Sequence, residues 1–172
     1  MNYRPPNQAD AAQAGAIRKA IPWSIRLVVL SPSLFLYAIA CATPAIEFLR
    51  NGVDPERWYG IEALLLGWQG VFIGQFGWFA NPILLLAYVL ILFRRFLAGA
   101  IFAIVSVGVA ANSLQLFHQH IPGDEGDVTH LEVKAFGIGF YIWVASLLAA
   151  VVAPLIGAIA VRYWHRKQSS AN

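Results

Sequence analysis

Residues 135–161 read AFGIGFYIWVASLLAAVVAPLIGAIAV, a stretch of twenty-seven residues without a charged side chain. About 20 apolar residues are enough for a helix to cross the roughly 30 Å of hydrocarbon in a bilayer. Lys134 and Arg162 close the stretch at its two ends. The sequence therefore predicts a transmembrane helix over 135–162, with lipid rather than water as its solvent.

Three further charge-free runs precede this stretch in the chain of 172 residues, at 27–46, 63–93 and 96–117. Only 12% of the residues are charged and 59% are hydrophobic, whereas soluble domains contain about 25% charged residues. This composition argues against a disordered chain, a nucleic-acid-binding surface and an ordinary soluble enzyme. We expect an all-α integral membrane protein with four transmembrane helices, at approximately 23–45, 60–94, 96–117 and 135–162.

The second run is too long for one straight crossing. A straight helix over 63–93 would measure about 47 Å at roughly 1.5 Å per residue, and Asn81-Pro82 interrupts it. Proline removes a backbone donor, and Asn followed by Pro suits the start of a helix. We therefore expect an additional interfacial helix over roughly 60–79, a break near 81, and a spanning piece that ends at Arg94. One long helix with a proline kink is the alternative.

The distribution of basic residues predicts the orientation. If both termini are cytoplasmic, nine of the twelve lysines and arginines lie on the inner side and three lie in the outer loops. Because Lys and Arg concentrate on the cytoplasmic side of membrane proteins, we expect the N and C termini to be cytoplasmic. The chain then divides into a cytoplasmic arm (1–20), one transmembrane domain (21–163) and a cytoplasmic tail (164–172). This asymmetry accounts for the net charge of +3 without a nucleic-acid partner.

Four glycines of the 60–79 segment recur at spacings of three and four residues: Gly67, Gly70, Gly74 and Gly77. In an α-helix they would share one face, and the aromatic side chains Trp68, Phe72, Phe76 and Phe79 would gather on the other. Small residues at this spacing let helices approach closely in lipid. The pattern predicts a packing face within the protein's own bundle or a docking face for another membrane protein. A slot for a cofactor such as haem or quinone is the third interpretation.

The outer loop over 118–132 contains three of the four histidines and four carboxylates. Imidazole and carboxylate groups are ligands for Zn, Cu, Mn and Fe. The candidate metal ligands are His118, His120, Asp124, Asp127 and His130. Their spacing matches no defined metal motif, so a polar cap over the helix ends is the competing interpretation. Apart from this metal ion, no cofactor is expected.

The polar side chains inside the apolar runs are uncharged: Gln69, Gln75, Asn81, Asn112, Ser113, Gln115 and Ser146. Charged groups within a bilayer mark proton relays and ion paths, so this pattern argues against a proton-coupled transporter. Hydrogen bonds between helices are the expected role of these side chains. Cys41 stands alone, and Ser113 and Ser146 have no charged partner on their own segments. We therefore assign no catalytic residue and expect no enzymatic activity.

Three fragments taken together carry a resemblance: Gly67-Trp68, Trp78-Phe79-Ala80-Asn81-Pro82, and the stretch from Gly137 to Ser146. They resemble a loose group of small bacterial inner-membrane proteins with four spanning segments. The resemblance covers roughly residues 58–147. It implies a four-helix topology and a multi-pass location in a bacterial inner membrane, and it carries no catalytic motif.

Three hypotheses for the function follow. The first is a non-enzymatic accessory subunit or an immunity-type protein, whose partners are the lipid bilayer and either another membrane protein or a second copy of the chain. The second is a metal-binding membrane protein that uses the outer loop over 118–132. The third is a small-molecule channel or carrier, which would act as an oligomer because four helices leave little room for a pathway.

Overall fold

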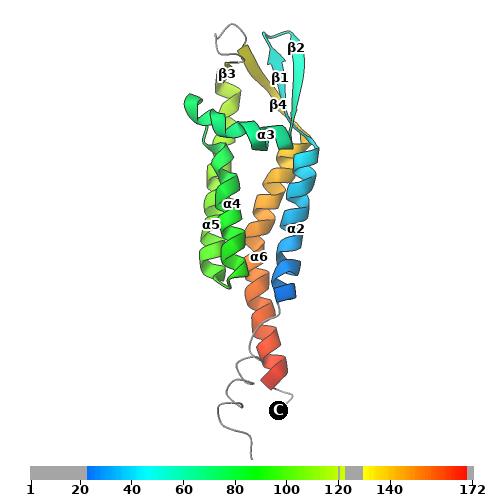
Figure 1. The fold of residues 1–172 in the computed structure, drawn as a ribbon, viewed down its shortest axis with the longest axis vertical. Coiled ribbons are helices and arrows are strands. Elements are labelled where there is room, and N and C mark those ends of the chain that lie inside the picture. The colour runs from blue at the N-terminus through cyan, green and yellow to red at the C-terminus, as the bar shows by residue number, and fades with distance from the viewer. Residues whose placement is uncertain (1–22, 120, 123–129, 170–172) are drawn as a thin grey trace, which may run out of the picture.

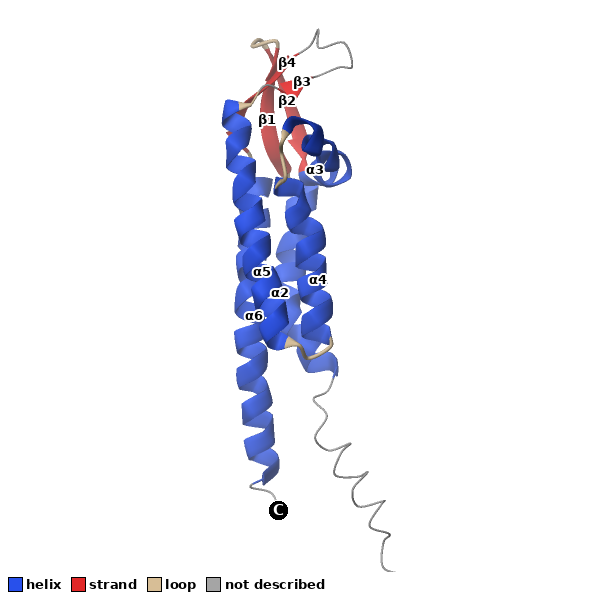
Figure 2. Cartoon of the chain, turned by 90° about the vertical axis from the view of Figure 1, so that its left-hand side faces the viewer, coloured by secondary structure: helices blue, strands red, loops and turns tan. Residues whose placement is uncertain are grey.

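The computed structural model describes residues 23–119, 121–122 and 130–169 (Figure 1). Four long helices stand side by side as a bundle, and a small sheet lies at one end of it (Figures 1 and 2). Helices α2 and α5 run toward the sheet, and helices α4 and α6 run away from it. The bundle helices are α2 (Trp23–Ala42), α4 (Ala80–Leu92), α5 (Phe96–Ala110) and α6 (Ile138–Ser169).

The segment before α4 crosses the sheet end of the bundle as a series of short helices (Figure 1). These are helix α3 (Gly60–Leu66) and the 3-10 helices η1 (Gly67–Ile73) and η2 (Gly77–Phe79). Asn81-Pro82 lies in the first turn of α4, where a proline costs no helical hydrogen bond. A further 3-10 helix, η3 (Ala111–His118), extends α5 toward the sheet.

A four-stranded antiparallel sheet corrects the all-α expectation. Its strands are β1 (Pro44–Arg50), β2 (Asp54–Tyr59), β3 (Ile121–Pro122) and β4 (His130–Phe136), in the order β2-β1-β4-β3. The segments between the apolar runs, interpreted from the sequence as outer loops, thus pair with each other. In the central pair, Phe48 of β1 lies opposite Val133 of β4.

The β1–β2 hairpin forms because Asn51-Gly52 makes a tight turn. Both residues have positive φ, 52° and 72°, and Val53 N–H donates to the carbonyl of Arg50 at 3.2 Å. Asn-Gly favours such turns because these two residues tolerate positive φ best. The turn is also joined to β4: Asn51 Oδ1 accepts the N–H of His130 at 3.0 Å, and the N–H of Asn51 donates to the carbonyl of His130 at 2.8 Å.

The bundle interior contains many small and hydroxyl-bearing side chains. Ser33 Oγ donates to the carbonyl of Ser146 at 2.6 Å and therefore accepts the hydroxyl of Tyr88, also at 2.6 Å. Ser106 Oγ donates to the carbonyl of Ala80 at 2.9 Å. These hydrogen bonds join α2, α4, α5 and α6. The fully buried alanines Ala80, Ala87, Ala103 and Ala150 fill the rest of the space between helices.

Among the described helices, two are long and apolar enough to cross a membrane by length and composition alone, Phe96–His118 and Ile138–Ala160. Three further apolar helical segments are shorter: Arg26–Ala42, Gly60–Ile73 and Gly77–Leu92. The structure thus gives two candidate spans where the sequence predicted four.

Candidate functional site

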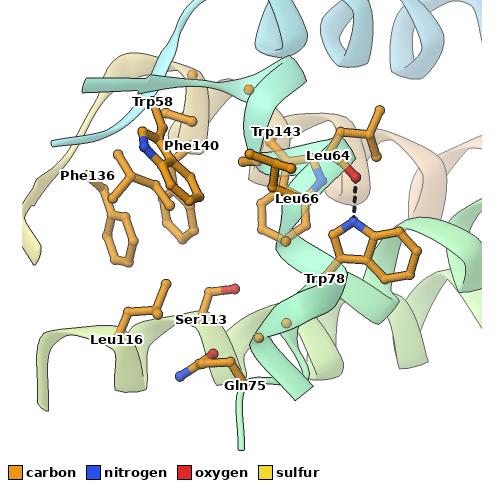
Figure 3. Close-up of a pocket in the computed structure, with 18 of the residues that line it drawn as sticks. Trp58, Leu64, Leu66, Gln75, Trp78, Ser113, Leu116, Phe136, Phe140 and Trp143 are labelled. Carbon is orange, nitrogen blue, oxygen red and sulfur yellow. Dashed lines mark hydrogen bonds between the residues drawn. The ribbon is translucent and has the colours of Figure 1, made fainter. Parts of the chain in front are cut away.

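A cavity of about 580 Å³ lies where the sheet meets the bundle. The sheet, the α3–η1 segment and the sheet-side ends of α2, η3 and α6 enclose it (Figure 3). Small-molecule sites in proteins measure roughly 300–1,000 Å³. The cavity is therefore large enough for a ligand and is the strongest candidate for a functional site among the described residues.

Aromatic rings form much of the cavity wall. Phe136 and Phe140 stack with their ring centroids 3.9 Å apart and their planes at 11°, and Trp143 lies 5.7 Å from Phe140. On the sheet, Trp58 packs edge-on against Phe48 at 5.1 Å. Figure 3 shows Trp58, Phe136 and Phe140 on one side of the cavity. Such a wall favours an apolar ligand because aromatic rings bury large apolar areas.

Trp58 is positioned from outside the cavity by an ion pair on the hairpin. Its indole N–H donates to Glu56 Oε1 at 3.1 Å, while the guanidinium of Arg50 donates to Glu56 Oε2 at 2.7 and 3.0 Å. The hydrogen bonds from Arg50 and then from Trp58 lower the pKa of the Glu56 carboxyl below its ordinary value. Glu56 therefore stays ionised and keeps accepting the indole proton of Trp58.

Asn81 forms the polar floor of the cavity. Its Oδ1 accepts the Tyr37 hydroxyl at 2.9 Å and the Trp143 indole N–H at 2.9 Å, and its Nδ2 donates to the Trp78 carbonyl at 3.0 Å. The Trp78 indole N–H in turn donates to the carbonyl of Leu64 at 2.7 Å (Figure 3). The amide group of Asn81, on α4, thus connects α2 and α6 to η2, which contains Trp78.

Three further polar side chains line the cavity, Gln69, Gln75 and Ser113. Gln69 is exposed, whereas Gln75 and Ser113 are buried (Figure 3). Gln75 is 6% exposed and Ser113 is 9% exposed. Gln75 Nε2 donates to Gln119 Oε1 at 2.6 Å. Within the described part of the chain, neither the side-chain carbonyl of Gln75 nor the hydroxyl of Ser113 has a hydrogen-bond partner. These two atoms are available to a ligand.

The cavity lining carries no formal charge in the part of the chain that the structure describes: it contains no Asp, Glu, Lys, Arg or His. Moving an ionised group from water into such surroundings costs far more than the burial of a neutral one. The arrangement can therefore bind a neutral molecule, and general acid–base chemistry by a carboxyl or imidazole group has no residue here to perform it.

The four glycines singled out from the sequence do not form one helical face, because the α-helix ends at Leu66 and η1 has 3-10 geometry. Gly67, Gly70 and Gly77 instead line the cavity. Gly74, with φ of 76°, ends η1 in the left-handed conformation. Their use as a docking face for a partner stays a prediction.

The three cavity glycines pack against the protein's own residues. A Cβ at Gly67 would lie 2.7 Å from Cδ1 of Trp78, and one at Gly70 would lie 2.9 Å from Cβ of Gln75. A Cβ at Gly77 would collide with Ser113 Oγ. The aromatic side chains of the same segment are largely exposed, at 47% for Trp68, 80% for Phe72 and 50% for Phe76, and Phe72 also borders the cavity.

The structure describes only two of the five proposed metal ligands. His118 ends η3 and His130 begins β4, whereas His120, Asp124 and Asp127 lie outside the described residues. Within the described residues, no group of three or more His, Cys, Asp or Glu side chains could hold a metal ion. The metal site in the outer loop therefore stays a prediction.

Two local features of the sequence indicate parts of the sheet that covers the cavity. Asn51-Gly52 is a strong hairpin signal, and the alternation of Leu131 and Val133 with Glu132 and Lys134 is typical of a strand. The first predicts a hairpin and the second a strand, but neither predicts that the two pair at the end of the bundle. Comparisons of the chain with models of protein families, with curated proteins and with solved structures found no match.

Proposed function

We propose that the four-helix bundle spans a bacterial inner membrane, with the sheet on the outer side and both termini in the cytoplasm. The observation that carries this proposal is the outward face of the bundle. Large apolar side chains are exposed on each of the four long helices, at 68% for Phe35, 62% for Leu85, 78% for Leu97 and 62% for Leu155. Water would penalise so large an exposed apolar surface, whereas lipid does not.

The thickness of the charge-free part of the bundle supports the same proposal. At the sheet end, Gly139 of α6 packs against Thr43, and at the other end Gly157 packs against the ring of Phe96. Helix α6 rises about 27 Å between these two glycines, at roughly 1.5 Å per residue. This is close to the thickness of bilayer hydrocarbon. At the inner boundary, Arg26 donates to the carbonyl of Leu92, close to Arg94 and Arg95.

We propose further that the protein acts by contact rather than by catalysis, as an accessory subunit or immunity-type protein for another membrane protein. The inward orientation of Gly67, Gly70 and Gly77 leaves the aromatic side of the 60–79 segment as the surface for a partner. This aromatic ridge is defined by Trp68, Phe72 and Phe76. The segment that carries it crosses the sheet end of the bundle (Figure 1), where we place the outer interface. Exposed aromatic clusters at such positions are typical of interaction sites.

Cysteine accessibility tests the topology. In a Cys41→Ala background, Val53→Cys places a thiol in the exposed hairpin turn and Arg95→Cys places one in the exposed α4–α5 connection. We expect a membrane-impermeant maleimide to label Val53→Cys in intact spheroplasts, and to label Arg95→Cys only after permeabilisation. Labelling of both sites in intact spheroplasts, or of Arg95→Cys alone, would contradict the proposed topology.

Site-specific photocrosslinking tests the accessory role. We expect benzoylphenylalanine at Phe72, which is 80% exposed on the aromatic ridge, to give a discrete adduct with one protein in native membranes. Phe35 is a matched control, because it is 68% exposed in the middle of α2, where only lipid is expected. If Phe72 gives lipid adducts alone, as Phe35 does, the ridge is not a partner surface.

A further inference from the structure

We propose that the cavity between the sheet and the bundle binds an uncharged lipophilic molecule with a neutral polar group at one end. The inference rests on the proposed membrane location, because the ligand would enter from the outer leaflet. Its ligand class follows from three properties of the described lining: apolar walls, the lack of charge, and two available polar atoms at one side.

The first property is the apolar wall. Rings from β2, β4 and α6 surround the cavity, and Leu64, Leu66 and Leu116 complete it (Figure 3). A molecule held there exchanges contact with water or lipid head groups for contact with aromatic and aliphatic carbon. The wall therefore selects a hydrocarbon chain or ring rather than a sugar or a nucleotide.

The second property is the lack of charge. The ion pairs of the sheet, Arg50 with Glu56 and Arg57 with Glu47, are formed by residues that do not line the cavity. A carboxylate or phosphate in the cavity would find no cation among the described lining residues. A neutral lipophile avoids this desolvation cost. The lining thus discriminates a fatty alcohol or an ester from a fatty acid with the same chain.

The third property is the pair of available polar atoms. The Gln75 carbonyl oxygen can accept a hydrogen bond and the Ser113 hydroxyl can donate or accept one. Both residues are more than nine-tenths buried, yet neither atom is among the fully buried atoms without a partner in the described part of the chain, so each can be reached from the cavity. A ligand group can therefore take the place of water at these atoms. Asn81 already accepts hydrogen bonds from Tyr37 and Trp143 and requires nothing further. The polar end of the ligand should therefore face Gln75 and Ser113.

Two kinds of membrane molecule share this chemistry: a diacylglycerol-type lipid and a prenylated quinone. Each combines a long hydrocarbon portion with hydroxyl or carbonyl oxygen and no charge. The hydroxyl of a diacylglycerol can donate to the Gln75 carbonyl oxygen, whereas a quinone carbonyl can only accept from the Ser113 hydroxyl, so the experiment includes a competition with each of them.

The test uses the full chain in lipid nanodiscs and two photoreactive probes of equal length, a diazirine-bearing hexadecanol and the corresponding hexadecanoate. We expect the alcohol to label peptides of the cavity, such as those that contain Leu64 or Trp143, on the order of tenfold more than the carboxylate does. Unlabelled diacylglycerol and prenylated quinone are then added as competitors. The one that suppresses cavity labelling identifies the source of the ligand, and failure of both to compete contradicts the proposal.

Cavity-filling variants provide the decisive comparison. Ala63→Phe and Leu116→Trp add bulk at two separate parts of the cavity lining. Gly108→Phe is the control: it also introduces a phenyl ring, but at a position where no atom lies within 4 Å of a Cβ built on the glycine. We expect labelling of the cavity to fall on the order of tenfold in the first two variants and to be unchanged in Gly108→Phe. Unfolding curves confirm which variants are folded. Undiminished labelling in a folded Ala63→Phe or Leu116→Trp protein, or equal labelling by alcohol and carboxylate, overturns the proposal.

The outcome is separable from that of the topology experiment. If Val53→Cys and Arg95→Cys behave as proposed and the probes do not enter the cavity, the membrane location stands and the ligand site fails. If the thiols show the wrong accessibility while the cavity binds the alcohol, the site stands and the location fails.

Discussion

Replacing Asn81 with leucine is expected to lower the free energy of unfolding by about 2–4 kcal/mol. Leucine has the same number and branching of side-chain heavy atoms as asparagine but can neither donate nor accept a hydrogen bond, so the change removes all three hydrogen bonds. The Tyr37 hydroxyl and the Trp143 indole N–H would both lose their acceptor, and the Trp78 carbonyl would lose a donor. Because these groups come from three helices, the loss weakens helix packing throughout the sheet-side half of the bundle.

Equilibrium unfolding by sodium dodecyl sulfate in mixed micelles measures this effect. Tyr37→Phe is the matched control, since it removes one hydrogen bond to Asn81 Oδ1 and leaves the one from Trp143 in place. We expect it to cost less than half as much as Asn81→Leu. Equal losses in the two variants would show that Asn81 does not join the helices as described.

Gly139→Val is expected to destabilise the protein by about 3 kcal/mol, at the upper end of the range for overpacked sites. Gly139 lies in the first turn of α6 and is buried. A Cβ there would lie 2.7 Å from the carbonyl oxygen of Thr43 and 2.9 Å from that of Pro44. Both obstacles are backbone atoms at the α2–β1 junction, so no side chain can rotate to relieve the contact. The sheet would have to move away from the helix.

Gly108→Val is the control, because Gly108 is also a helical glycine but has nothing within 4 Å of its virtual Cβ. We expect its unfolding free energy to stay within about 0.5 kcal/mol of the original. Gly139→Ala should fall between the two, since alanine introduces the Cβ without the branches of valine. The same detergent titration compares all three. A Gly139→Val protein as stable as Gly108→Val would refute the close approach of α6 to the α2–β1 junction.

The helices of the bundle could be predicted from the sequence because each depends on a local property. The charge-free runs contain α4 and α5 and most of α2 and α6, which extend past their ends, and the break before α4 follows from the proline at position 82. Whether an apolar run forms one helix or several depends also on tertiary contacts. The spacing of Gly67 and Gly70 is that of one face of an α-helix. In the structure, however, the α-helix has changed to 3-10 geometry at this point, and the two glycines make close contacts with Trp78 and Gln75.

The sheet could be predicted only in part. Asn51-Gly52 marks the hairpin locally, yet the pairing of β1 with β4 joins segments that no local pattern connects. Charged side chains on these strands made them resemble loops, because one face of a two-layer arrangement is polar. The cavity could not be predicted from local patterns either. Its walls come from β2, β4, α3 and α6, and these elements come together only in the tertiary fold.

The pairing of β1 with β4 also determines at which stage of synthesis the sheet can form. In the proposed topology, the hairpin reaches the outer side as soon as α2 has been inserted, but nearly half of the chain lies between Phe48 and its neighbour Val133. Until the ribosome has delivered that neighbour, the edge of β1 that pairs with β4 has no partner and is open to mispairing. The sheet therefore cannot close before β4 has been synthesised, and a chain that stalls before residue 130 keeps that edge of β1 exposed.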